Sequence, residues 1–290
     1  MTSYSGKKMN PDHFHRSQIK FYVILTLFST VTGLPILFIF AQALKPIDEL
    51  FAYPPRFLVR NPSLQNFKRL FEVIGGSDIP VSRYLFNSLI STGLTVLLTL
   101  LVCTMAGYAL SKKKFRLNAA IFNMNTLALM FVPVAVMVPK YLVICRLGLI
   151  NSLWVQILPA LAMPVGLFLI KQFIDQIPDE LIEAARMDGA REFHIFRYII
   201  IPMSRSSMAT VTILAFQTSW TSIEASSMYI SREELRTFPY FMSTLTSAGN
   251  GVAGQGMAAA AVLILLLPNL LIFILLQKQV MATMAHSGIK

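Results

Sequence analysis

Long apolar stretches alternate with short polar segments along the 290-residue chain. Each stretch is close to the length of about 20 residues that an α-helix needs to cross the hydrocarbon core of a membrane. Pro133, Pro159 and Pro268 lie inside such stretches and are expected to kink helices, because neighbouring groups can satisfy the freed backbone. The pattern therefore predicts six transmembrane helices, at residues 21–44, 87–110, 119–139, 153–170, 207–229 and 257–277.

Composition fixes the class of protein. Hydrophobic residues make up 55% of the chain and charged residues only 13%, with a mean hydropathy of +0.61. Such a chain cannot present an ordinary water-facing surface. We expect an all-α integral membrane protein, with a polar tail at residues 1–20, a six-helix domain at 21–278 and a second tail at 279–290.

The basic residues predict which side of the membrane each loop faces. The formal net charge is +11, and Lys112, Lys113, Lys114 and Arg116 crowd into one short loop. Short loops rich in Lys and Arg stay in the cytoplasm. This places both tails and the polar segment 172–205 inside, with outer loops at 45–86, 140–152 and 230–256. Because the cations are scattered along the chain, they do not predict nucleic-acid binding.

The polar segment 180–202 predicts a helix-turn-helix between the fourth and fifth spans. Asp179 marks a helix start, and Leu181, Ala184 and Ala185 share one small apolar face through their i, i+3 and i+4 spacing. Gly189 can adopt the left-handed conformation that closes a helix. A second helix is expected to begin between residues 190 and 201.

This segment resembles the EAA loop of permease subunits of bacterial ABC importers, through Glu183-Ala184-Ala185, Gly189 and Ile201-Pro202. The resemblance implies a coupling helix that seats in a groove on a cytoplasmic ATPase. Glu183 would pair with a basic group of the ATPase, and the two alanines would allow close seating. Asp188 and Gly189 would form the turn that follows.

A second resemblance covers the chain from about residue 21 to its end. It is similar to permeases of maltose-type carbohydrate importers in Lys45-Pro46, Glu49, Pro54-Pro55, Asn66-Phe67, Asn87-Ser88 and the segment 147–152. The resemblance implies a type I ABC importer permease fold in the bacterial cytoplasmic membrane. Implied partners are a second homologous permease, a solute-binding protein outside, and two ATPase subunits that hold ATP and Mg. The tail 281–290 resembles permeases for complex or acidic oligosaccharides, such as uronate oligomers.

The outer half of the fifth span departs from this family, because Trp220 is followed by Thr221 where members often carry asparagine. Trp220 and Glu224 are candidates for the solute path or its mouth, since an ionisable residue at membrane depth is costly and often functional. Alternatively, Glu224 is wet and pairs with a neighbour.

The last outer loop contains a glycine-rich stretch. It formally spells a dinucleotide fingerprint, but no strand precedes it and a membrane helix follows. We expect a mobile loop, and the resemblance implies that it contacts the binding protein through Gly249, Asn250, Gly251 and Gly254.

The sequence lacks the residues that several other activities require. No phosphate-binding GxxxxGK[ST] loop occurs, so ATP hydrolysis is expected on a separate subunit and the chain is not an enzyme. His13 and His15 in the tail do not make a metal site. A secondary transporter would need buried ionisable groups in mid-span and is less favoured. A permease of the same architecture for amino acids or peptides remains the nearer alternative.

Overall fold

The computed structural model describes residues 19–54, 56–75, 79–248 and 252–287. Every regular element in these ranges is a helix, as the all-α prediction requires. Three helices are long and apolar enough to cross a membrane without interruption: α1 (Ile19–Leu44), α4 (Val81–Lys112) and α15 (Val252–Ser287). Three bent helix pairs bring the number of candidate spans to six.

The third predicted span, 119–139, is not one helix. α5 (Asn118–Ala128) ends, and a short 3-10 turn, η2 (Pro133–Val136), leads into α6 (Met137–Arg146) at an angle of 111° to α5. Pro133 has no N–H with which to continue the earlier helix, and its fixed φ suits the first position of the next element. The prediction that Pro133 kinks a continuous helix was therefore wrong.

The fourth and fifth spans are interrupted as well. α7 (Trp154–Leu161) contains Pro159 and meets α8 (Pro164–Asp175) at 44°. α12 (Arg205–Trp220) ends before the predicted boundary at 229, and the chain is non-helical until α13 (Glu224–Met228). Pro268 lies inside α15 and does not end it, which agrees with the expectation that it is not a helix boundary.

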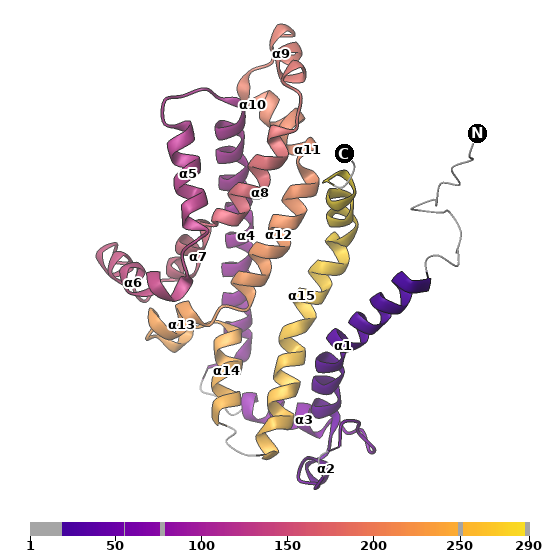
Figure 1. Cartoon of the computed structure of the whole chain (residues 1–290). Coiled ribbons are helices and arrows are strands. Elements are labelled where there is room, and N and C mark those ends of the chain that lie inside the picture. Colours follow the sequence, from indigo (N-terminus) through magenta and orange to yellow (C-terminus); the bar gives the residue numbers. More distant parts are fainter. Residues whose placement is uncertain (1–18, 55, 76–78, 249–251, 288–290) are drawn as a thin grey trace, which may run out of the picture.

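A knuckle of short helices joins α8 to α12 at one end of the bundle (Figure 1). It consists of α9 (Asp179–Met187) and a second helix built from α10 (Glu192–Ile195), a π-helical turn η3 (Phe196–Ile200) and α11 (Ile201–Met203). In the π turn, the Ile201 N–H donates to the Phe196 carbonyl. The turn ends two residues before Pro202, which cannot donate a helical hydrogen bond, so the change of register fits a helix that must accommodate a proline.

The opposite end of the bundle carries short helices where long loops were expected. The segment 45–86 contains α2 (Ile47–Leu50) and α3 (Gln65–Gly75), and the segment 230–256 contains η4 (Glu233–Leu235) and α14 (Phe238–Ala248). Gly254 belongs to α15, so the expectation of a loop as far as residue 256 was wrong. Gly249, Asn250 and Gly251 lie outside the described residues.

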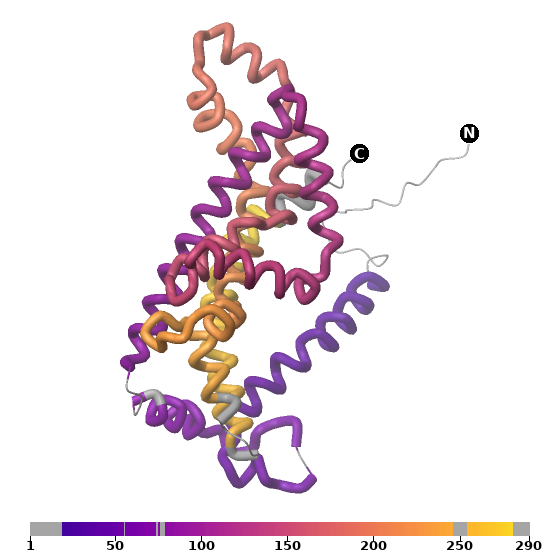
Figure 2. The backbone as a smooth tube through the Cα atoms, turned by 90° about the vertical axis from the view of Figure 1, so that its left-hand side faces the viewer, coloured from indigo at the N-terminus to yellow at the C-terminus, as the bar shows by residue number. Residues whose placement is uncertain are grey.

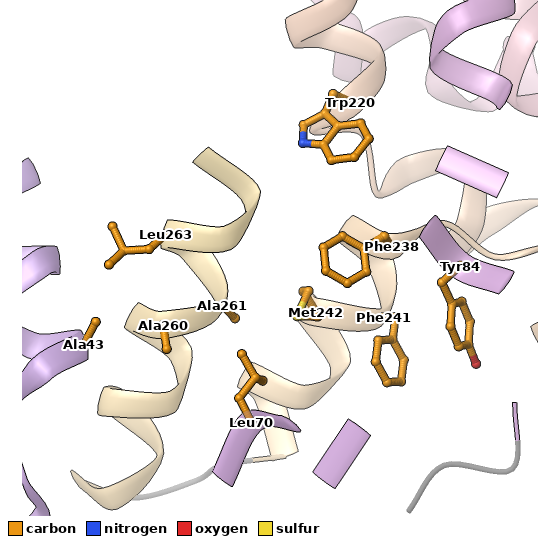
Figure 3. Close-up of a cluster of buried hydrophobic side chains, with 10 residues drawn as sticks. All are labelled: Ala43, Leu70, Tyr84, Trp220, Phe238, Phe241, Met242, Ala260, Ala261 and Leu263. Carbon is orange, nitrogen blue, oxygen red and sulfur yellow. The ribbon is translucent and has the colours of Figure 1, made fainter. Parts of the chain in front are cut away.

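The main apolar core at this end joins α1, α3, α4, α12, α14 and α15 (Figure 3). The rings of Tyr84 and Phe241 stack with centroids 4.5 Å apart. Trp220, Leu70 and Met242 are almost completely buried in the same cluster. Burial of large side chains from so many elements fixes how the outer helices sit on the spans.

The first span diverges from the bundle toward its N-terminal end (Figure 2). It packs against α15 and α3, yet none of its most apolar stretch is buried within the subunit. Phe21, Phe28 and Leu37 are among its exposed side chains. A helix that is apolar all round requires lipid or other membrane helices as its surroundings.

Candidate functional site: the knuckle between α8 and α12

The first helix of the knuckle begins and ends where its sequence dictates. Pro178 precedes α9 with extended backbone angles, and acidic residues occupy the first turn, where they complement the helix dipole. At the other end Gly189 has φ 83°, a conformation that side chains disfavour. The Gly189 N–H donates to Arg186 O at 3.0 Å, and the Ala190 N–H donates to Ala185 O at 2.9 Å. These two bonds form a Schellman closure, so the predicted turn at Gly189 is confirmed.

The two alanines of the knuckle face different ways. Ala185 packs beside the buried Ile182 against the core cluster that includes Ile174 and Ile195. Ala184 is exposed. The prediction that Leu181, Ala184 and Ala185 form one face was wrong in this respect, because Ala185 faces inward and helps to seat α9 on its own subunit.

The outward side of the knuckle is unusually apolar for a polar segment. Its exposed large residues include Leu181, Met187, Phe193 and Tyr198, and Met187 is 88% exposed. Glu183 and Asp188 are exposed on the same helix or directly after it. Exposed apolar groups edged by charges are typical of surfaces that contact another protein.

A lysine from α4 holds the start of α9. The Lys112 Nζ donates to the carbonyl oxygen of Ile177 at 2.6 Å and forms a salt bridge with Asp179 Oδ1 at 2.7 Å. The Lys112 side chain is only 6% exposed, whereas that of Asp179 is largely exposed. Hydrogen bonding to Lys112 is the main reason why the pKa of the Asp179 carboxyl lies below its usual value.

A second set of contacts holds the start of α10. The Tyr108 hydroxyl donates to Glu192 Oε2 at 2.7 Å, and Lys113 forms a salt bridge with Glu192 Oε1. Arg186, at the end of α9, approaches the same carboxylate at 3.3 Å. Hydrogen bonds from Lys113 and then Tyr108 lower the pKa of Glu192. One carboxylate therefore joins both helices of the knuckle to α4.

A third contact secures α8 to the same end of α4. The Ser111 hydroxyl donates to Asp175 Oδ1 at 2.6 Å, and Lys171 pairs with Asp175 Oδ2 at 2.7 Å. From the sequence, the basic loop after α4 indicated only membrane orientation. Lys112 and Lys113 also form salt bridges with Asp179 and Glu192 of the knuckle. The only hint of these pairs in the sequence was the presence of acidic residues in the knuckle.

The two remaining candidates lie near the outer half of the fifth span. Trp220 is buried, and its Nε1 donates to the carbonyl oxygen of Leu265 at 3.1 Å. Glu224 forms a salt bridge with Lys140 at 2.8 Å, and the Tyr229 hydroxyl donates to it at 3.4 Å. The structure thus pairs Glu224 with a neighbour, while a role of Trp220 or Glu224 in the solute path stays a prediction.

Several residues that carried the family resemblance bind backbone groups at the end of the bundle opposite the knuckle. The Asn87 amide donates to Glu234 O at 2.7 Å and to Arg236 O at 3.0 Å. The Ser88 hydroxyl accepts the N–H of Phe238 at 2.8 Å. These side chains fix the connection between the fifth and sixth spans on α4, a role that the sequence did not reveal.

The fold is that of a multi-pass membrane subunit, and its knuckle projects from the bundle with large apolar side chains exposed. Residues 103–280 match the family described as binding-protein-dependent transport system inner membrane component, and the chain belongs to this family. It is thus a permease subunit of the inner membrane.

Curated relatives match nearly the whole chain. The probable ABC transporter permease protein YurM of Bacillus subtilis (strain 168) is 30% identical over 276 residues, which cover 93% of this chain and 87% of YurM. The arabinooligosaccharides transport system permease protein AraQ of the same organism is 30% identical over 283 residues, covering 95% and 99%.

A solved bacterial ABC transporter involved in the import of the acidic polysaccharide alginate contains a chain of the same fold. The TM-score is 0.74 at 22% identity, with 92% of this chain and 99% of that chain covered. A chain of the alginate transporter in complex with an alginate pentasaccharide-bound periplasmic protein gives a TM-score of 0.55 at 14% identity.

Proposed function

We propose that this chain is one of two permease subunits of an ATP-driven importer that carries an oligosaccharide across the bacterial cytoplasmic membrane. The names of similar permeases support the solute class, since they refer to arabinooligosaccharides, galactooligosaccharides and melibiose, raffinose and stachyose. Recognition outside is assigned to a solute-binding protein. ATP and Mg are assigned to two partner subunits, and both termini of this chain are placed in the cytoplasm.

The observation that carries the energetic part of the proposal is the construction of the knuckle. Its outward side presents Leu181, Ala184 and Met187, while Lys112 and Glu192 secure its inward side to α4. An ATPase that bound the outward side would therefore pull on a membrane span and not on a loose loop. In this scheme Glu183 and Asp188 supply charge at the edge of the contact, and Gly189 sets the angle between the two knuckle helices.

The test compares two glycine substitutions at positions of positive φ. Gly189 and Gly148 both have positive φ, 83° and 66°, and an added Cβ meets no neighbour within 4 Å at either site. Each change to alanine is expected to cost about 1–2 kcal/mol of local strain. The complete transporter, with partner permease, ATPase and binding protein, is reconstituted in proteoliposomes, and ATP hydrolysis is measured with and without saccharides.

We expect saccharide-loaded binding protein to stimulate hydrolysis in the native assembly and in Gly148→Ala, but several-fold less in Gly189→Ala. Equal stimulation of both variants would show that the knuckle does not couple hydrolysis to transport. Stimulation by amino acids or peptides, and by none of the saccharides, would replace the proposed solute class with the alternative one.

A further inference from the structure

Three interruptions of membrane helices meet at one cavity of about 440 Å³. Pro133 begins the element after the α5 break, Met163 lies between α7 and α8, and Ser222 lies between α12 and α13, and all three line this cavity. In Figure 1 the three changes of direction occur about half-way along the bundle. α4 supplies a further wall through Ser91.

Interrupted helices at this depth leave backbone N–H and C=O groups without helical partners. In a membrane protein such groups are tolerated where they are buried against protein or line a water-filled space. Three separate breaks around a single cavity, each with its own local sequence, are unexpected for a packing defect. Discontinuous helices that converge in this way are typical of solute sites in transporters.

The side chains around the cavity are suited to hydroxyl groups. Its polar lining includes Ser91, Gln156, Ser219, Ser222, Ser226 and Thr237. The Gln156 amide nitrogen donates to Leu235 O at 2.8 Å, but its Oε1 is buried without a hydrogen-bond partner in the described part of the chain. Gln156 is only 9% exposed, and a buried acceptor without a partner is costly. A solute hydroxyl that donates to Oε1 would remove this cost.

The charge at the cavity selects between classes of solute. Lys140 is the charged residue among those that line the cavity, and its Nζ already pairs with Glu224 at 2.8 Å. The pair leaves no net charge for an acidic sugar or for the ammonium and carboxylate groups of an amino acid. A volume of this size lies in the range of small-molecule sites.

We propose that this cavity binds an uncharged, hydroxyl-rich unit of the transported saccharide, with Gln156 Oε1 accepting from a sugar hydroxyl. The site is this subunit's own contribution to the solute path, and the inference rests on the proposed function. The proposal places part of solute recognition among the membrane-spanning helices, in addition to recognition by the binding protein.

The test uses neighbouring substitutions in the complete reconstituted transporter. Ser222→Leu fills the cavity, whereas Thr221→Leu changes the adjacent residue of the same break, which is exposed and does not line the cavity. Gln156→Leu removes the acceptor at nearly constant volume. Uptake and ATP hydrolysis are measured with the uncharged raffinose, stachyose and arabinotriose, and with the acidic alginate pentasaccharide.

We expect an uncharged saccharide to be carried by the native assembly and by Thr221→Leu. In Gln156→Leu the apparent KM should rise by about fivefold or more, as expected for the loss of one hydrogen bond to a neutral group, and Ser222→Leu should slow uptake at least as much. If both cavity variants behave like Thr221→Leu while the native assembly carries the saccharide, the cavity proposal fails and the proposed function stands. If the native assembly responds only to alginate, the neutral assignment is wrong; if it responds to no saccharide, the proposed function itself fails.

A labelling experiment covers the case in which the cavity variants do not assemble. Ser222→Cys and Thr30→Cys are compared in a Cys145→Ala background, with a small charged methanethiosulfonate reagent and with or without the transported saccharide. Reaction at residue 222 that the saccharide slows supports the site, with residue 30 on the exposed α1 as the lipid-side control. Absence of reaction at 222, or reaction that the saccharide leaves unchanged, would overturn it.

Discussion

Replacing Lys112 by methionine tests whether the contacts between α4 and the knuckle transmit force. The change keeps most of the apolar stem but removes the hydrogen bond to Ile177 O at 2.6 Å and the salt bridge to Asp179 at 2.7 Å. The bond from a charged, nearly buried donor is worth about 1.5–3 kcal/mol. The salt bridge to the exposed carboxylate of Asp179 adds only about 0–1 kcal/mol.

A total near 2 kcal/mol corresponds to a shift of roughly thirtyfold in the equilibrium between an anchored and a released knuckle. If the anchored form transmits ATPase closure, Lys112→Met should lower saccharide-stimulated hydrolysis by about tenfold or more. Basal hydrolysis should change little, because the outward side of the knuckle is untouched. Uptake per ATP hydrolysed should fall, since α9 then moves without α4.

The control is Lys114→Met, two residues along the same basic loop. Lys114 is exposed and forms no salt bridge within the described residues, yet it carries the same charge for membrane orientation. In Lys114→Met, saccharide should stimulate ATP hydrolysis as much as in the native protein. Equal coupling in both variants would refute the reasoning, whereas equal loss in both would assign the effect to membrane orientation and not to the knuckle contacts.

Three further predictions address packing, helix rigidity and pH. Gly256→Ala should lower the unfolding temperature in detergent, because the added Cβ would lie 2.6 Å from the buried amide of Asn66. Gly93→Ala is the control and should leave the unfolding temperature unchanged, because an added Cβ meets no neighbour within 4 Å. Leu101→Gly should weaken saccharide-stimulated hydrolysis more than Leu101→Ala, since glycine softens α4 by about 1 kcal/mol relative to alanine. The pKa of Glu192 is lowered in the folded protein, so its contribution to stability is present above the ordinary carboxyl value of 4.5 and is lost as the pH falls below it. Thermal unfolding from pH 7 to 4 should show this loss in the native protein and a smaller one in Glu192→Gln.

The sequence predicted the elements whose signals are local. Long apolar runs predicted the uninterrupted α1, α4 and α15 because hydrocarbon requires about 20 apolar residues in a row. Gly189 predicted the end of α9 because the left-handed conformation there disfavours any side chain. Both signals depend on a few neighbouring residues, and tertiary contacts are not needed to interpret them.

Breaks within the third and fifth spans were beyond this kind of reasoning, whereas the expected bend at Pro159 agrees with the 44° angle within the fourth span. An apolar run looks the same whether the helix continues or turns, and a proline is compatible with either outcome, as Pro133 and Pro268 demonstrate. The break after Trp220 contains no proline at all. What decides these cases is the set of neighbouring helices that can satisfy the freed backbone groups, which periodicity does not encode.

The contacts that hold the knuckle were hidden for a different reason. Lys112 and Asp179 are 67 residues apart, and Tyr108 and Glu192 are 84 apart. Only packing of α4 against α8 brings these residues together. Charge patterning indicated the side of the membrane, but the identity of each partner depends on the register between two spans.

The inferred sites have α4 in common. At its N-terminal end Asn87 and Ser88 hold the connection to the sixth span, and Ser91 lines the proposed solute cavity. At its C-terminal end Tyr108 and Lys112 hold the knuckle. The helix runs for 32 residues without a proline or a break, which at 1.5 Å per residue is about 48 Å. An unbroken helix resists bending far better than the interrupted spans around it, so we expect any movement of the knuckle to displace α4 as a unit past the broken helices. In the proposed importer, an ATPase that moved the knuckle would then shift the cavity wall supplied by α4 relative to the other walls, which would link nucleotide state to the affinity for the solute.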